Sequence, residues 1–265
     1  MFDHLSGAKI FTKLDLHDTY HHICICQGNE WKTAFHTQYS QFEYTVMPFG
    51  LCNAPATFQV YINQAMRGIL NKFIIVYLDD ILIYSQNEEE YVRHVWEVLH
   101  HLEQHNLFAK LSKCEFHKWD ICFLGLHMGA DGISMDPDWV ATIWDWLMLE
   151  SFHDIQVFLG FTRFFCQFIK NYAGVTTPLT DLLQGMEQGK KKGPFHLTME
   201  GCQAFKCLKQ EFMEPPVLKH FDYCLPTLVV TDTSQYAVAA ILLQPGDDLL
   251  AEPQVCDWHP VVYYS

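Results

Sequence analysis

The sequence has no apolar run long enough to cross a membrane. No window of about 18 consecutive apolar residues occurs in its 265 residues. The N-terminal stretch MFDHLSGAKI carries an acid and a histidine where a secretory signal needs an apolar segment. We therefore expect a soluble protein with no membrane partner.

The chain also has few basic residues. Lys and Arg number 17 against 31 Asp and Glu, so the formal net charge is −14. Proteins that bind nucleic acid usually concentrate Lys and Arg on one surface, and this balance argues against such a protein. A local basic groove, or metal ions bound to carboxylates, would offset the acidic total.

Cysteine is present, but paired cysteine motifs are not. The ten cysteines are scattered and include no CxxC pair. This usage is typical of small buried residues in a reducing compartment rather than of a secreted disulfide framework. We expect an intracellular protein, cytoplasmic or nuclear.

In the first half, apolar patterns of strands and helices alternate, which predicts an α+β fold. Residues 8–27 read as two strands that flank a turn, and residues 53–70 as a helix capped by Asn53. Residues 88–106 read as a second helix. The apolar face predicted for the first helix is Phe58, Ile62, Ala65, Met66 and Ile69, and that for the second is Val92, Val95, Trp96, Leu99 and Leu102.

The second half begins with a short β-rich segment, CFLGLHMGADGIS. Asp136 and Pro137 then predict the start of a helix that runs through Leu147, and residues 153–172 predict another. The phenylalanines of this second helix, at helical spacing, indicate a core rather than a base-stacking surface. A polar linker at 184–195, a helix near 201–212 and a β section at 227–244 complete the pattern.

The stretch FIIVYLDDILIYS places Asp79 and Asp80 side by side within an apolar run. Neighbouring strand residues face opposite sides, so a turn must lie there, and we expect a hairpin with the pair at its tip. Two buried carboxylates need a cation or become partly protonated, and the natural cation is Mg²⁺, which prefers oxygen ligands. The alternative is an exposed hairpin turn, where Asp is common.

A third acid, Asp15, ends the apolar stretch IFTKLDL. If the hairpin packs beside that strand, three carboxylates meet. Three carboxylates are the minimum for a two-metal site, in which one ion activates an attacking hydroxyl and the other stabilises a leaving phosphate.

Several sequence blocks follow one another in order over nearly the whole chain: FTKLDLHDTYHHI, EWKTAF, FEYTVMPFGLCNAPATFQ, VYLDDILIYS, LFAKLSKCEF, FLGLHMGADGISMDP and VFLGF with FIKNYAGVTTPLTDLL. Through these blocks the chain resembles the reverse transcriptase of gypsy-class LTR retrotransposon polyproteins. The resemblance implies an α+β right-hand polymerase palm with partial fingers and a helical thumb, followed by a truncated RNase H-like segment. It implies an RNA-directed DNA polymerase that uses a primed RNA or DNA template, deoxynucleoside triphosphates and two Mg²⁺ ions, or Mn²⁺.

The same resemblance implies roles for individual residues. Asp15, Asp79 and Asp80 would be the catalytic, metal-binding carboxylates. Tyr20 would exclude a 2′-hydroxyl on the incoming nucleotide. The remaining nucleotide-pocket positions are Pro48, Phe49, Gly50 and Gln59, and the primer-binding positions are Phe123, Leu124 and Gly125.

The resemblance also implies three domains: a palm with partial fingers at 1–135, a thumb-like subdomain at 136–192, and a connection with a truncated RNase H-like domain at 193–265. Asp232 matches the first carboxylate of that last domain. Because the sequence stops at Ser265, before the other carboxylates, we expect no RNase H activity.

Some positions depart from the family pattern. His17, Asp18 and Thr19 replace the usual residues after Asp15, and Cys166 and Gln167 replace two thumb arginines. These changes keep a second hypothesis open: an inactive remnant that acts as a nucleic-acid-binding or protein-interaction module. A metal-dependent nuclease is a third reading, and the oligomeric state stays open.

Overall fold

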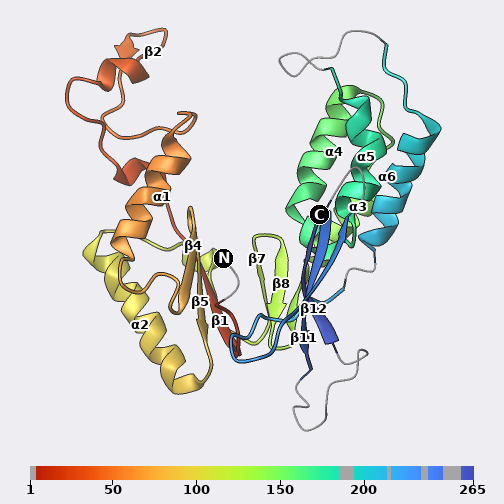
Figure 1. Ribbon diagram of the computed structural model, residues 1–265. Helices are drawn as coiled ribbons and strands as arrows, with labels where there is room; N and C mark the ends of the chain where they lie inside the picture. Colours follow the sequence, from red (N-terminus) through yellow and green to blue (C-terminus); the bar gives the residue numbers. More distant parts are fainter. Residues whose placement is uncertain (1–3, 186–193, 214–215, 234–237, 247–257) are drawn as a thin grey trace. The chain divides into compact units, whose positions relative to one another are not determined.

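The computed structural model describes residues 4–185, 194–213, 216–233, 238–246 and 258–265 (Figure 1). The chain divides into two compact units, residues 1–121 and 122–265. No helix in the described ranges is long and apolar enough to span a bilayer. Most of the linker predicted at 184–195, with the domain boundary predicted at 192, lies outside the described residues.

An antiparallel sheet is the centre of the first unit. Its described strands follow the order β4-β5-β1-β6. Their bounds are β1 Ile10–Asp15, β4 Ile74–Tyr77, β5 Asp80–Ser85 and β6 Glu115–Lys118. β1 and β5 pair along their full length, from Ile10 opposite Ser85 to Asp15 opposite Asp80. The end of β1 at Asp15 therefore lies beside the start of β5 at Asp80, although the two strands are distant in sequence.

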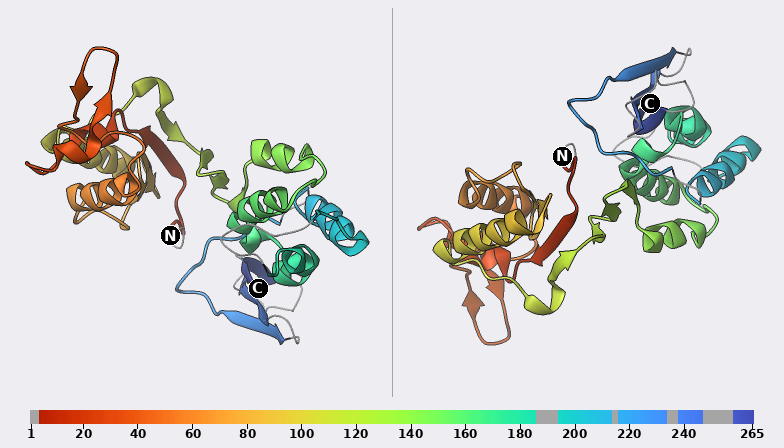
Figure 2. Two further views of the ribbon diagram at one scale, coloured as in Figure 1. Left: turned by 90° about the horizontal axis from the view of Figure 1, so that it is seen from above. Right: turned by 90° about the horizontal axis from the view of Figure 1, so that it is seen from below.

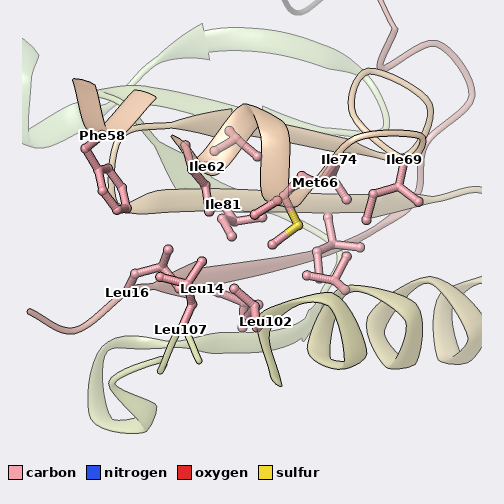
Figure 3. Packing of buried hydrophobic residues seen from close by; sticks show 14 of the residues in the cluster. Leu14, Leu16, Phe58, Ile62, Met66, Ile69, Ile74, Ile81, Leu102 and Leu107 are labelled. Atoms are coloured by element: carbon pink, nitrogen blue, oxygen red, sulfur yellow. The ribbon is translucent and has the colours of Figure 1, made fainter. Parts of the chain in front are cut away.

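One face of this sheet is covered by two helices, α1 (Ala54–Ala65) and α2 (Glu88–Gln104). Figure 3 shows their side chains meeting those of the strands in a single apolar cluster. Alternate strand residues belong to it, because neighbouring residues of a strand face opposite sides of the sheet. The cluster includes Leu14, Leu16, Phe58, Ile62, Met66, Ile69, Ile74, Val76, Ile81, Ile83, Val98 and Leu102.

Helix α1 confirms the predicted apolar face, since all five residues expected there are buried. It begins after Asn53, as predicted, but ends at Ala65 rather than Leu70 because the chain turns at Met66 to Ile69. Gly68 has a φ of 98°, a left-handed conformation that a right-handed helix cannot include.

The predicted apolar face of α2 is wrong for most of its length. Val92, Trp96 and Leu99 are exposed, whereas Tyr91, His94, Val98 and Leu102 are buried. His94 belongs to the core because its ring stacks on Phe73, with centroids 3.9 Å apart, and its Nδ1 bonds the Ser85 hydroxyl at 2.8 Å. A histidine with these contacts can lie in the core, where the sequence pattern predicted only apolar residues.

The second strand predicted within residues 8–27 is also wrong. The YHHICIC stretch holds a 3₁₀ turn, η1 (Thr19–His22), and only an isolated bridge from Cys24 to Val46. Asp18, with a φ of 50°, ends the extended chain. The residues that follow include η2 (Glu30–Thr33) and a short hairpin of β2 (Phe35–His36) and β3 (Gln41–Phe42).

The second unit contains the predicted β-rich segment and a bundle of helices (Figures 1 and 2). The segment forms a sheet of β7 (Ile121–Phe123), β8 (Leu126–Gly129) and β9 (Gly132–Met135). The helices are α3 Pro137–Trp144, α4 Phe152–Phe164, α5 Tyr172–Leu182 and α6 Met199–Glu211. Asp136 caps α3 as predicted, accepting the Asp138 N–H at 3.0 Å.

The single helix predicted for 153–172 is interrupted. After α4 comes a 3₁₀ turn, η4 (Cys166–Phe168), and Asn171, with a φ of 55°, precedes α5. Phe165 and Phe168 are buried, as predicted for a core. Phe164 is 55% exposed, so the prediction is wrong for that ring.

The C-terminal β section is confirmed as a sheet of β10 (Leu228–Thr233), β11 (Val238–Pro245) and β12 (Trp258–Tyr264). All three described strands pair antiparallel, in the order β10-β11-β12. The buried Gln244 joins β11 to the preceding loop: its amide donates to the Asp222 carbonyl and accepts the Asp222 N–H.

The α1 core contact gives a stability prediction. Ile62 is fully buried between α1 and the sheet, so Ile62→Ala should lower the free energy of unfolding by about 2–5 kcal/mol through lost burial and a residual cavity. Val60, 67% exposed on the same helix, is the control. Val60→Ala should change the free energy of unfolding by less than about 0.5 kcal/mol. Urea titration followed by circular dichroism compares the two; equal effects would contradict the packing.

Candidate active site

The paired aspartates lie at a hairpin tip, as predicted. β4 and β5 are joined by the two residues Leu78 and Asp79, and Asp80 is the first residue of β5, opposite Tyr77. Leu78 has a φ of 53°, the positive value that the first position of a type II′ hairpin turn requires. The turn frees Asp79 and Asp80 from the strict alternation of a strand.

Strand register brings the third carboxylate to this tip. Asp15 is the direct cross-strand partner of Asp80, so both side chains leave the same face of the sheet, opposite the one that Leu14 and Ile81 bury. The Asp79 carbonyl accepts the N–H of Leu16 at 2.8 Å. Backbone pairing therefore gathers three acids from two distant segments.

Gln59 of α1 fastens the turn from the other side. Its side-chain oxygen accepts the Leu78 N–H at 2.8 Å, and its amide nitrogen donates to the Val76 carbonyl at 3.3 Å and to Asn63 Oδ1 at 2.9 Å. The resemblance indicated Gln59 only as a residue behind the nucleotide pocket. In the structure two of these three hydrogen bonds are with the hairpin that carries the aspartates.

Two lysines contact the carboxylates, and the sequence reading missed both. Lys113 Nζ lies 2.9 Å from Asp15 Oδ2, and Lys13 Nζ lies 3.9 Å from Asp80 Oδ1. Lys13 could have been found, because residues two apart on a strand share a face and Lys13 is two before Asp15. Lys113 is 98 residues from Asp15 in the sequence, so no local sequence pattern indicates their contact.

The electrostatics reflect this crowding. Burial raises the pKa of the Asp80 carboxyl; Lys13 and Lys113 lower it, while the charges of Asp79 and Asp15 raise it. The hydrogen bond to Asp15 raises the pKa of Lys113, and the charges of the three acids add to that shift. The tip is thus a local concentration of negative charge that favours cations.

The donor set suits a hard divalent ion, since Mg²⁺ and Mn²⁺ prefer carboxylate oxygens. In the part of the chain that the structure describes, however, no three His, Cys, Asp or Glu side chains are already arranged as ligands of one ion. Asp15 Oδ2 is held by the Lys113 ammonium, so a metal ion would have to displace that cation to bind there.

The predicted nucleotide-pocket residues gather beside α1. The Tyr20 ring packs edge-on against Phe49, with centroids 5.1 Å apart, and against Phe58 at 5.9 Å. Phe49 is 65% exposed, whereas Pro48 is buried. Gly50 has a φ of 92°, a conformation that other residues rarely adopt. The exposed Phe49 ring therefore packs on Tyr20, which in turn packs on the buried Phe58 ring.

The predicted primer-binding residues form another tight turn, in the second unit. β7 ends at Phe123, Leu124 and Gly125 make the turn, and β8 begins at Leu126. Asp232 lies on β10, exposed and opposite Ala239 of β11. Nothing in the described geometry joins Asp232 to a second carboxylate.

Two segments of the chain match family models of known proteins. Residues 1–128 match the family model "Reverse transcriptase (RNA-dependent DNA polymerase)", and residues 197–265 match "RNase H-like domain found in reverse transcriptase". The Transposon Tf2-3 and Tf2-4 polyproteins of Schizosaccharomyces pombe are each 37% identical to it over 261 residues. The match spans 98% of this chain but 19% of each relative's length.

Solved structures agree on the fold. A foamy viral protease-reverse transcriptase in complex with double-stranded DNA matches 97% of this chain and 42% of its own, with a TM-score of 0.78 and 21% identity. The same kind of protein in complex with an RNA/DNA hybrid gives a TM-score of 0.77 at 20% identity. The predicted right-hand polymerase fold is confirmed, and the chain belongs to the reverse transcriptase family, in the form found in retrotransposon polyproteins.

Proposed function

We propose that this chain is the polymerase segment of a retrotransposon polyprotein and extends a primer 3′-hydroxyl along an RNA or DNA template. Asp15, Asp79 and Asp80 are the carboxylates that hold two divalent ions, Mg²⁺ or Mn²⁺. The observation that carries the proposal is the pairing of Asp15 with Asp80, with Asp79 tied to the same strand end through Leu16.

Divalent ions bound there would activate the primer hydroxyl and neutralise the charge that develops on the leaving pyrophosphate. The chain's own residues supply position. Gln59 and the Leu16 N–H fix the turn, so the backbone that carries Asp79 and Asp80 is held in place before cations bind. Lys113 neutralises Asp15 in the absence of metal.

The aromatic side chains of the pocket select the nucleotide. Tyr20, held against Phe49 and Phe58, is the ring that a ribonucleotide 2′-hydroxyl would meet. Pro48 and Gly50 shape the loop beneath Phe49. Deoxynucleoside triphosphates are therefore the proposed substrates.

The domain assignment is part of the proposal. Residues 1–135 are the palm with partial fingers, 136–192 the thumb, and 193–265 the connection and RNase H-like segment that contains Asp232. The similar proteins with solved structures were captured with double-stranded DNA or an RNA/DNA hybrid, which supports a primer–template partner.

Primer extension tests the reaction. The chain should extend oligo(dT) on poly(rA) when Mg²⁺ is added, and the double variant Asp79→Asn, Asp80→Asn should lose at least about a hundredfold of the rate, because charge neutralisation carries this chemistry. Asp131→Asn is a matched control, an exposed acid at the same second position of a two-residue hairpin turn. A folded wild-type chain without extension would favour the inert module.

A second prediction concerns stability. A folded-state pKa raised by burial means that ionised Asp80 opposes folding at any pH above the usual carboxyl range, and that this penalty fades as pH falls through the folded pKa. Asp80→Asn should therefore raise the melting temperature at pH 7 in metal-free buffer. Below about pH 3.8, where Asp80 is protonated in both states, the gain should disappear. Differential scanning calorimetry measures the melting temperatures. A lower melting temperature of the Asp80→Asn variant at pH 7 would contradict the claim that ionised Asp80 opposes folding.

Nucleotide choice gives a third prediction. Tyr20→Val should raise the use of ribonucleotides relative to deoxynucleotides by roughly 10- to 100-fold, because one steric contact discriminates by about that much. Tyr20→Phe keeps the ring and should keep the discrimination. Competing ATP and dATP on a poly(rU) template measures the ratio, and equal ratios in both variants would reject the assignment.

A further inference from the structure

The β7–β8 turn has a conformation that its own sequence opposes. Leu124 and Gly125 both have positive φ, 53° and 76°, as in a type I′ hairpin turn. Glycine adopts this conformation readily, but in a leucine it brings Cβ too close to the backbone carbonyl oxygen. Contacts from outside the hairpin must therefore stabilise the turn.

Those contacts come from α3 and the residue that follows α4. The Gly125 carbonyl accepts the N–H of Asp136, the cap of α3, at 3.1 Å. A Cβ added at Gly125 would lie 3.2 Å from Trp139 Nε1, 3.3 Å from Trp139 Cε2 and 3.4 Å from Phe165 Cζ. The Trp139 indole and the Phe165 ring thus close over the tip of the turn.

Trp139 is in turn fixed by the helices. Its backbone N–H donates to the Asp136 carbonyl at 3.0 Å, and its indole stacks on Phe161 of α4, with centroids 5.0 Å apart and an interplanar angle of 27°. Phe165, 6.0 Å from the indole, is buried. One face of the indole therefore rests on the helical core while its edge meets the turn.

We propose that Trp139 is a positioning residue: its indole fixes the Leu124–Gly125 tip against α3 and α4, and thereby sets the orientation in which the turn meets the terminal nucleotide of the primer. The proposal rests on the primer-binding role given above to Phe123, Leu124 and Gly125. It adds a residue outside that turn, on which the geometry of the turn depends.

Three variants of the full chain test it. Trp139→Ala removes the ring, and Trp139→Phe keeps an aromatic face for Phe161. Trp144→Ala is the matched control, because Trp144 lies on the same helix, is 54% exposed and contacts Lys209 rather than the turn. Each variant is measured for amide hydrogen exchange at residues 124–126, for primer–template affinity, and for kcat and KM in primer extension.

We expect Trp139→Ala to speed exchange at the turn and to lower kcat about tenfold, with primer–template affinity and the nucleotide KM changed by less than about threefold, because misplacing a bound reactant slows turnover more than binding. Trp139→Phe should recover most of the loss. Trp144→Ala should behave as the wild type in all three measurements.

Two results would overturn the proposal. One is exchange at residues 124–126 that matches the Trp144→Ala control, and the other is faster exchange with unaltered kcat. A wild-type chain that extends no primer contradicts the proposed function instead. The exchange measurement still decides the role of Trp139 in that case: unchanged amides reject it, and faster amides support it.

Discussion

The antiparallel register of β1 and β5 is the constraint on which the site depends. Leu14 and Ile81 are opposite one another and buried under the two helices, so their neighbours Asp15 and Asp80 must share the other face. A slip of one residue would exchange the two faces and place carboxylates in the apolar cluster. The same burial that stabilises the sheet therefore sets the position of the chemistry.

Assembling these acids creates an electrostatic conflict that the fold only partly resolves. Asp80 has a raised pKa through burial, with the neighbouring acids adding to it, and Lys13 and Lys113 act in the opposite direction. The Lys113 side chain is 56% exposed and can yield to a stronger cation, whereas the Lys13 side chain is 25% exposed and lies 3.9 Å from Asp80. A site that opposes folding in the absence of its ligand is expected where function, rather than stability, has determined the residues.

The sequence was most informative where pattern and chemistry agreed. The hairpin at Asp79 followed from strand alternation, and the face of α1 followed from helical spacing. The buried face of α2 could not be read this way, because three of the five predicted residues, Val92, Trp96 and Leu99, are exposed. His94 enters the core instead, through partners at Ser85 and Phe73. Contacts formed at long range, such as Lys113 with Asp15, leave no periodic trace in the sequence.

The conformations and contacts of the turns were the other features that the sequence did not predict. Nothing in the local sequence around Leu124 predicts a left-handed leucine, since the stabilising ring of Trp139 comes from the following helix. The role of Gln59 was likewise hidden, because a glutamine on a helix is ordinarily a solvated residue. Both cases concern polar or strained groups whose conformation depends on a tertiary partner.

The most direct test of the central claim is Mn²⁺ titration of the ¹⁵N-labelled chain followed by NMR, since the paramagnetic ion broadens only nearby amide signals. The account predicts early, selective broadening around residues 14–16 and 78–81, absent in the Asp79→Asn, Asp80→Asn variant. Sharp signals at those residues, while amides elsewhere broaden, would contradict a metal site at the β1–β5 strand end.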